Sequence, residues 1–135
     1  LRLAGGSLLG FEQKAMDMWG QSIEGGSNAE VQEKDFLPSC GKIELLNIPV
    51  GNSGRFDTAL YHDYQVPPFY DSMLGKPIVH APTRDGSIRK MQVALSELVI
   101  DGVKNTAELQ MGLLEDERFV GGSYTTDFML TRDAG

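Results

Sequence analysis

The chain has 135 residues, of which 41% are hydrophobic and 23% charged, so we expect one compact soluble domain over residues 1–135 and no second domain. It contains no run of about twenty apolar residues, which excludes a membrane-spanning helix. The formal net charge of −7 repels phosphate backbones, which argues against nucleic acid as a partner.

The first residues read as the end of a helix. Leu1–Gly6 has the pattern of a last helical turn running into two glycines, and no initiator Met precedes it. We therefore expect the chain to begin inside a longer protein. Residues 1–10 carry one positive charge and only a short interrupted apolar stretch, so they do not match a secretory signal.

Cys40 is the only cysteine. A single thiol excludes an internal disulfide and a cysteine cluster for zinc or iron–sulfur binding. A reducing compartment suits such a chain, and a cytoplasmic location is expected.

The first half of the chain has the spacing of turn residues that is typical of a small antiparallel sheet. Glycines and prolines separate short apolar segments, which predicts strands near Met16–Glu24, Ile43–Asn47 and Arg55–Tyr61. In Met16–Trp19 the two methionines alternate with Asp17 and Trp19, as expected of a strand with one solvated face.

Prolines modify the pairing expected in the middle of the chain. Pro67-Pro68 removes two backbone donors and predicts an extended corner within Tyr64–Tyr70. Pairing is then expected to resume over Asp71–Ala81. Pro77 lies inside that apolar run, which predicts an edge strand or a bulged one.

The apolar period changes to that of a helix from Asp85 onward. Asp85 and Gly86 suit a helix start, and Gly102 suits its exit. Spacings of three and four residues place one set of apolar side chains on a single stripe. That set is Ile88, Met91, Leu95 and Leu98.

A second helix is expected after Asn105. Asn105 and Glu108 form an N-cap with a back-bonding acid, and a leucine stripe follows. Val120–Gly122 closes this helix, and the tail Ser123–Leu130 is expected to pack back as a short strand or turn. The stripe consists of Leu109, Leu113 and Leu114. The predicted class is α+β, a small antiparallel sheet followed by two or so helices packed on it.

The glycine-rich stretches do not form a phosphate-binding loop. They lack the lysine and the strand-to-helix context that such a loop needs, so turns or bulges are favoured. The stretches are Gly25-Gly26, Gly51–Gly54 and Gly121-Gly122.

Histidines and serines carry no recognisable catalytic or metal-binding pattern. His62 and His80 lie far apart without an acid at helical ligand spacing, so structural roles are favoured and no metal is expected. Ser7, Ser22 and Ser72 lack the flanking glycines of a nucleophile elbow. A nucleophilic hydrolase is therefore not expected.

Three charged residues keep more than one interpretation. Glu24 and Glu30 flank Gly25-Gly26, where a solvated or cap-bonding face is favoured over an acid/base pair. Arg55, in the turn Asn52–Asp57, is an ordinary surface residue, an anion ligand or a subunit contact. From the residue types and their spacing alone, the only conclusion is that the chain is a soluble α+β domain.

Longer strings resemble the C-terminal domain of biotin carboxylases, the enzymes that carboxylate biotin with ATP in acetyl-CoA carboxylase and related carboxylases. Tyr64–Lys76 is similar to the family's G-Y-x-V-P-P-Y-Y-D-S-M-I-x-K. Ile88–Lys104 resembles I-x-R-M-x-x-A-L-x-E-x-x-I-x-G-[IV]-K. Weaker matches, in family order, are Ser27–Glu30, Phe36–Ile43 and Arg55. Together they extend over nearly the whole chain.

The resemblance implies an enzyme whose active site is built by two regions, of which these residues are one. An ATP-grasp region, expected before Leu1 and absent from these residues, holds ATP, magnesium and bicarbonate in this family and supplies most of the chemistry. The C-terminal domain completes the biotin side and contributes to a homodimer, and the family's dimer-contact arginine falls on Arg55. The biotin is carried by a biotin carboxyl carrier protein, and the acetyl-CoA branch serves fatty acid biosynthesis. The 135 residues are expected to bind no cofactor and to be inactive alone.

One departure falls on the catalytic position. The family's E-[AC]-R-[IL]-N-A-E contains an arginine beside bicarbonate that stabilises the biotin enolate, whereas Glu24–Glu30 places Gly26 there. Loss of such an electrostatic stabiliser costs about two to three orders of magnitude in turnover. A full-length protein with Gly26 is therefore expected to have a strongly reduced turnover.

Further departures keep two other hypotheses open. Pro77 replaces an aliphatic residue, Cys40 replaces a proline, and Asn105-Thr106 reverses the family's T-N, which suggests a divergent copy. The main alternative to an enzyme part is a non-catalytic dimerisation or binding module derived from the family. A domain with no function of its own is the third.

Overall fold

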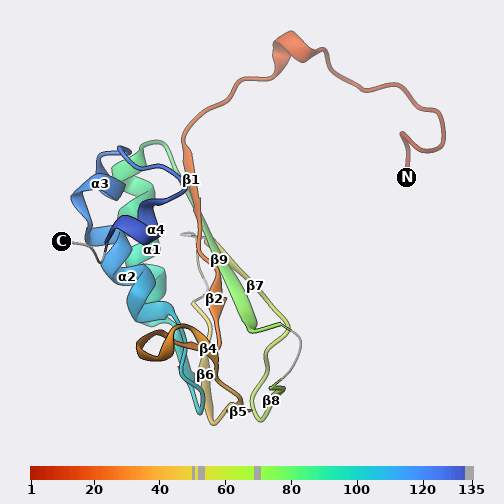
Figure 1. Cartoon of the computed structure of the whole chain (residues 1–135). Coiled ribbons are helices and arrows are strands. Elements are labelled where there is room, and N and C mark those ends of the chain that lie inside the picture. Colours follow the sequence, from red (N-terminus) through yellow and green to blue (C-terminus); the bar gives the residue numbers. More distant parts are fainter. Residues whose placement is uncertain (50, 52–53, 69–70, 133–135) are drawn as a thin grey trace.

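The computed structural model describes residues 1–49, 51, 54–68 and 71–132, and one long strand organises it (Figure 1). This strand, β9 (Met73–Ala81), is paired on both sides. β1 (Gln21–Glu24) and β2 (Ser27–Asn28) follow one another along one side, and β7 (Gly54–Thr58) pairs with the other. All three pairings are antiparallel, as the sequence predicted.

Three two-stranded ladders extend the molecule at its lower end in Figure 1. Each is antiparallel. One joins two neighbouring segments of the chain, and the other two join segments that are distant along it. The ladders are β3 (Glu30–Val31) with β4 (Leu37–Pro38), β5 (Gly41–Lys42) with β8 (Gln65–Val66), and β6 (Leu45–Asn47) with β10 (Val99–Asp101). Two short 3₁₀ turns, Gln13–Ala15 and Gln32–Lys34, complete this half.

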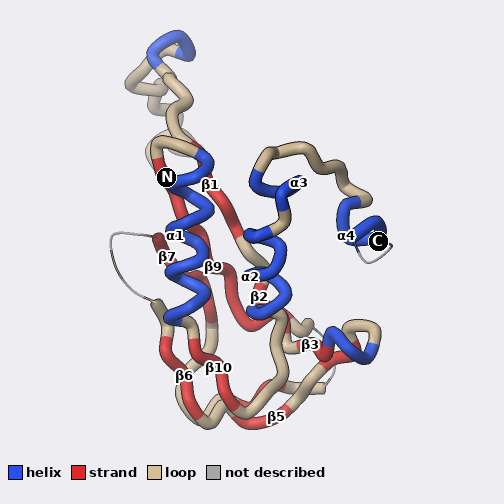
Figure 2. Tube along the Cα trace, turned by 90° about the vertical axis from the view of Figure 1, so that its left-hand side faces the viewer, coloured by secondary structure: helices blue, strands red, loops and turns tan. Residues whose placement is uncertain are grey.

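The helices lie on one face of the main sheet (Figures 1 and 2). They are α1 (Arg84–Glu97), α2 (Ala107–Glu115), α3 (Glu117–Val120) and α4 (Phe128–Arg132). α1 packs on β9 and β1, and α2 packs beside α1. The α+β class is confirmed, although the described residues contain two short helices beyond the two or so expected.

The predicted apolar stripe of the first helix is confirmed. Ile88, Met91 and Leu95 are buried, with Met91 only 1% exposed. The helix begins one residue before the predicted Asp85, because Thr83 is its N-cap and the Thr83 hydroxyl accepts a hydrogen bond from Gly86 N at 3.2 Å. The stripe faces the sheet because spacings of three and four return to the same side of a helix.

The predicted exit of this helix at Gly102 is wrong. α1 ends at Glu97, and the next residues form β10, which pairs with β6 and was not expected from the sequence. Val99–Asp101 is too short to show a period of two, so only its partner strand identifies it. Gly102 instead forms the turn after β10, with φ of +98°.

The core lies between α1 and the inner face of the sheet. Alternate residues of β9 point inward, and Val79 and Ala81 are 1% and 2% exposed. Burying one such aliphatic side chain stabilises the fold by roughly 1.5–3 kcal/mol. The buried cluster consists of Ala29, Ile43, Val66, Leu74, Val79, Ile88, Met91, Leu95, Leu98, Ile100 and Leu114.

The prediction that Pro77 marks an edge strand is wrong, since β9 is the central strand. The missing N–H of Pro77 is tolerated because β1 and β2 separate opposite it, at Gly25-Gly26. Gly25 N donates to Pro77 O at 2.9 Å, so the carbonyl is still paired. The alternative prediction, a bulged strand, is closer to the structure: the step from Ser27 to Asn28 on β2 lies opposite two steps on β9, from Gly75 to Met73, so the extra residue is in β9.

The predicted strand near Met16–Glu24 is only partly present. Of that range, Gln21–Glu24 forms β1, while residues 1–19 form an arm that extends away from the body (Figure 1). Apolar side chains on the arm are exposed, including Leu8 at 94% and Met18 at 102%. Trp19 ends the arm edge-on to His80, with ring centroids 4.7 Å apart.

Other boundaries differ by a few residues. The strand expected over Ile43–Asn47 covers only its last three residues, and that expected over Arg55–Tyr61 ends at Thr58. Of the corner predicted in Tyr64–Tyr70, Gln65–Val66 forms β8, while Phe69 and Tyr70 lie outside the described residues.

The C-terminal part holds two further corrections. The predicted N-cap Asn105 is displaced by Thr106, although Asn105 Oδ1 still accepts from Ala107 N at 3.0 Å. The tail expected as a strand or turn forms the short helix α4 instead. Phe128 on it is 8% exposed, and the Arg118 guanidinium lies 4.7 Å from its ring centroid.

Among the helices of the described ranges, none is both long enough and apolar enough to cross a bilayer.

Candidate functional site

The structure brings some of the predicted site residues together and separates others. Glu24, Gly26 and Glu30 lie around the break between β1 and β2, and all three border one pocket. Arg55 lies on β7, on the far side of β9 from this break. His80 bonds the arm through Trp19 O, with Nε2 3.1 Å away. The described residues contain no group of three or more metal-ligating side chains.

The two glycines at the break have opposite surroundings. A Cβ atom on Gly25 would lie 2.6 Å from Gln110 Oε1 and 3.3 Å from Pro77 Cγ, so a side chain at this position requires the Gln110 side chain to move. The nearest non-adjacent atom to a Cβ on Gly26 is Asn28 Oδ1, at 4.0 Å. A long side chain therefore starts in open space at position 26, whereas at position 25 it would displace the Gln110 side chain.

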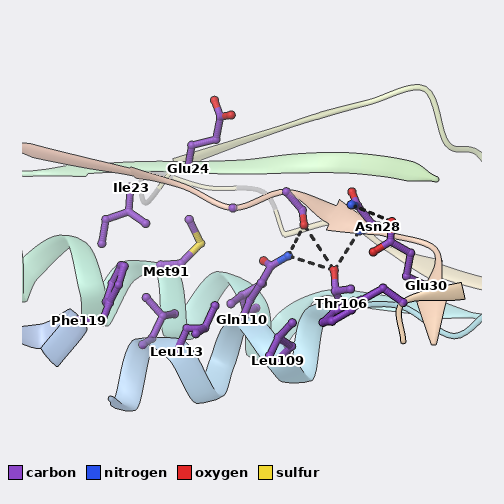
Figure 3. A pocket seen from close by; sticks show the side chains of 15 residues that line it. Ile23, Glu24, Asn28, Glu30, Met91, Thr106, Leu109, Gln110, Leu113 and Phe119 are labelled. Atoms are coloured by element: carbon purple, nitrogen blue, oxygen red, sulfur yellow. Dashed lines mark hydrogen bonds between the residues drawn. The ribbon is translucent and has the colours of Figure 1, made fainter. Parts of the chain in front are cut away.

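Two residues hold this break in place: Thr106, which is the N-cap of α2, and Gln110 within α2 (Figure 3). Asn28 N donates to Thr106 Oγ1 at 3.0 Å, and Thr106 N donates to Asn28 O at 3.1 Å. Gln110 Nε2 donates to Gly26 O at 2.6 Å. Sequence reasoning missed both residues, because each acts on a segment about eighty positions earlier in the chain and neither belongs to a local motif.

Replacing Thr106 with valine should destabilise the domain by about 1–3 kcal/mol, because the shape is kept while Asn28 N loses its acceptor in a buried place. Thr106 is 6% exposed. Urea unfolding of the valine variant, compared with Thr106→Ser as the hydroxyl-retaining control, measures this cost. Equal midpoints for the two variants would show that the hydroxyl does not hold the break.

The charges around the break are mostly negative or already paired. Glu24 Oε1 accepts from Lys76 Nζ at 2.9 Å, and this hydrogen bond raises the pKa of Lys76. Glu30 Oε1 accepts from Ser72 Oγ at 2.5 Å and from Asn28 Nδ2 at 3.3 Å. The acid/base interpretation of the two carboxylates gains no support, since both act as hydrogen-bond acceptors within the fold.

A pocket of about 320 Å³ opens between the β1–β2 break and α2 (Figure 3). Its inner wall is apolar, with Met91 at the bottom and leucines of α2 along one side. Its polar groups are carboxylates, a hydroxyl and side-chain amides. The described residues that line it include no lysine, arginine or histidine, so they do not fit stabilisation of a developing negative charge.

Comparison with known proteins gives a consistent result. A family model described as the biotin carboxylase C-terminal domain matches residues 27–131. Biotin carboxylase 1 of Bacillus subtilis is 41% identical over 133 residues, which cover 98% of this chain and 30% of that protein. The biotin carboxylase of Haemophilus influenzae is 43% identical over 129 residues, covering 96% of this chain and 29% of that protein. The chain thus spans about 30% of the length of these relatives.

Solved structures show the same fold. The biotin carboxylase domain dimer of Hydrogenobacter thermophilus 2-oxoglutarate carboxylase, in complex with Mg-ADP, ADP and bicarbonate, aligns with a TM-score of 0.92 and 36% identity. The alignment covers 97% of this chain and 29% of that one. The antiparallel sheet with helices on one face is therefore the fold of the corresponding part of that carboxylase.

Proposed function

We propose, from the premise that this chain belongs to the family of biotin carboxylase C-terminal domains, that it is the C-terminal part of a ligase that carboxylates biotin. In this proposal the complete protein uses ATP and bicarbonate, and the biotin is attached to a carrier protein. The supporting observation is the match along nearly the whole chain to carboxylases, one of them solved with Mg-ADP and bicarbonate.

ATP and magnesium belong, in this proposal, to an ATP-grasp region outside these 135 residues. The described residues offer no three-ligand cluster for a metal ion and no lysine-bearing glycine loop for phosphates. We therefore expect the 135 residues expressed by themselves to hydrolyse no ATP. A cytoplasmic location, suggested by the lone Cys40, is part of the same proposal.

The biotin side of the site is where this chain would contribute. At the place of the family's arginine stands Gly26, and the surrounding groups are Glu24, Glu30 and the oxygen of Asn28. These acceptors do not fit an anionic ureido oxygen or bicarbonate, which need a fixed cation. The proposed parent enzyme is accordingly a weak catalyst as it stands.

A homodimer contact through Arg55 is the proposed assembly. The Arg55 side chain is 71% exposed on the outer strand β7, and its Nε lies 3.0 Å from Asp57 Oδ1. A guanidinium paired on one edge keeps donors for a partner carboxylate. Residues 52 and 53 of the turn before it lie outside the described residues.

The test of the enzyme proposal uses the full-length parent protein. Its reading frame should encode an ATP-grasp region before Leu1, and purified parent should hydrolyse ATP in a weakly biotin-dependent manner. The same assay on the 135 residues alone is the control and should give no hydrolysis. A reading frame without an ATP-grasp region would refute the proposal.

A non-catalytic dimerisation or binding module is the second candidate, and Gly26 favours it because a domain released from catalysis can lose the arginine. Sedimentation of the chain with and without Arg55→Glu tests whether the isolated chain dimerises through Arg55. The module predicts a dimer that the charge reversal dissociates, with Lys14→Glu on the arm as a control. A monomer unaffected by Arg55→Glu removes the dimer.

A further inference from the structure

We propose that His80 makes the root of the arm, the junction Trp19-Gly20, a pH-sensitive hinge. Acidification tightens this hinge, and a rise in pH loosens it. The inference concerns residues 1–19 and the sheet to which they are attached, and it does not depend on the carboxylase activity.

The arm extends away from the body and is joined to it at its root (Figure 1). The backbone hydrogen bonds of residues 1–16 stay within the arm, as does the ion pair between Lys14 and Glu12. Within the ranges that the structure describes, the one hydrogen bond that joins residues 1–19 to the body connects His80 Nε2 and Trp19 O, at 3.1 Å. The direction of the arm therefore depends on this bond and on the backbone of Gly20.

The junction is built closely around the imidazole of His80. The rings of Trp19 and His80 meet in a T-shaped contact, with centroids 4.7 Å apart. Gly20 has φ of +75°, and a Cβ there would lie 2.7 Å from His80 Nε2 and 2.5 Å from Ala81 O. Glycine allows the backbone to approach this closely because it has no Cβ. A side chain at position 20 would displace the imidazole from Trp19 O.

The body holds the backbone around His80 independently of the arm. His80 pairs with Ser22 of β1 across the ladder, and the Ser87 hydroxyl donates to Gln21 O at 2.5 Å. Lys90 Nζ on α1 donates to His80 O at 2.9 Å. Because these contacts use the backbone of His80 and its neighbours, a change at the imidazole acts on the arm and leaves the sheet in place.

Protonation of His80 strengthens the bond that holds the arm. Trp19 O is an acceptor, so His80 Nε2 carries a hydrogen when the two bond. A neutral imidazole carries that hydrogen in only one of its two tautomers, whereas an imidazolium always carries it. A charged donor also makes a hydrogen bond roughly twice as strong as a neutral one. The bond is therefore strongest at acidic pH and weakens as the pH rises through the range in which histidine titrates, about pH 5–8.

The charged groups around His80 leave this pH dependence to the imidazole. The arm brings Asp17, two residues before Trp19, and α1 brings Lys90. The outer face of the sheet, on which His80 lies, carries two ion pairs. Carboxylates and lysines ordinarily keep their charge over about pH 5–8, so these groups give a constant background. The two ion pairs are Glu24 with Lys76 and Asp57 with Arg55.

Time-resolved fluorescence anisotropy of Trp19, the only tryptophan, measures the mobility of the arm's root. On titration of the chain from pH 8 to pH 5, the amplitude of the fast local rotation should fall in one transition, and quenching of Trp19 by acrylamide should fall in parallel. Far-ultraviolet circular dichroism, expected to stay constant, checks that the body remains folded. A local rotation that does not change, or that increases on acidification, would overturn the proposal.

Three variants assign the transition to one side chain. His80→Gln keeps an N–H donor without the charge, so the pH transition should be lost. His80→Phe keeps a ring against Trp19 but no donor, so the root should stay mobile at both ends of the titration. His62→Gln removes the other histidine and should leave the transition unchanged. A transition that persists in His80→Gln, or that disappears in His62→Gln, would show that His80 does not control the hinge.

Discussion

Gly26→Arg in the full-length parent enzyme is expected to raise biotin carboxylation by about two to three orders of magnitude. A fixed guanidinium beside the ureido group stabilises the charge that develops on its oxygen, and loss of one such stabiliser typically costs that factor. The measurement is the turnover number for carboxylation of free biotin, together with biotin-dependent ATP hydrolysis.

The geometry of the break allows this substitution. A Cβ at position 26 meets no atom closer than Asn28 Oδ1 at 4.0 Å, so the new side chain starts in open space. Lys76, the nearby cation, is hydrogen bonded to Glu24 and does not take over the role. We therefore expect the gain to appear in turnover without a loss of stability.

Two controls separate charge from bulk. Gly26→Gln adds a long polar side chain without a charge and should give little gain. The reciprocal change, arginine to glycine at the matching position of the Haemophilus influenzae relative, should lower its turnover by a similar factor. If Gly26→Arg leaves carboxylation unchanged while the reciprocal change lowers the turnover of the relative, position 26 of this chain does not correspond to the family's arginine. If neither change alters turnover, the proposed role of the arginine is wrong.

Gly102→Ala should be strongly destabilising, by about 3–5 kcal/mol, because positive-φ strain and close backbone contact add. Gly102 has φ of +98°, and an added Cβ would lie 1.9 Å from Lys42 O and 3.0 Å from Glu44 N. Both are backbone atoms of the neighbouring segment and cannot rotate away. Displacing them strains the contact between the segments that carry β5 and β10, including the hydrogen bond from Glu44 N to Asp101 O.

Gly122→Ala is the matched control for this prediction. Gly122 also has positive φ, +71°, but a Cβ there has Arg84 Nε as its nearest neighbour at 3.8 Å. It should cost only the conformational strain, about 1–2 kcal/mol. Urea midpoints of the two variants give the comparison, and equal costs would show that close backbone approach adds nothing at Gly102.

The sequence by itself determined the class, the helix stripe and the family. The spacing of Ile88, Met91 and Leu95 identifies a buried face because helical periodicity is a local property of the chain. The proline-rich and helical motifs carried the family resemblance, which the comparisons confirm. Gly26 was found in the same way, as one letter within a motif, although its role remains a prediction.

Only the tertiary structure decided which strand is central and what surrounds the break. Pro77 looked like an edge residue, yet β9 is central because its neighbours separate opposite that proline, which no local pattern reports. Thr106 and Gln110 reach Gly26 and Asn28 across about eighty residues. The pocket follows from that long-range contact, because burial and hydrogen-bond satisfaction depend on which segments meet in space and not on their spacing along the chain.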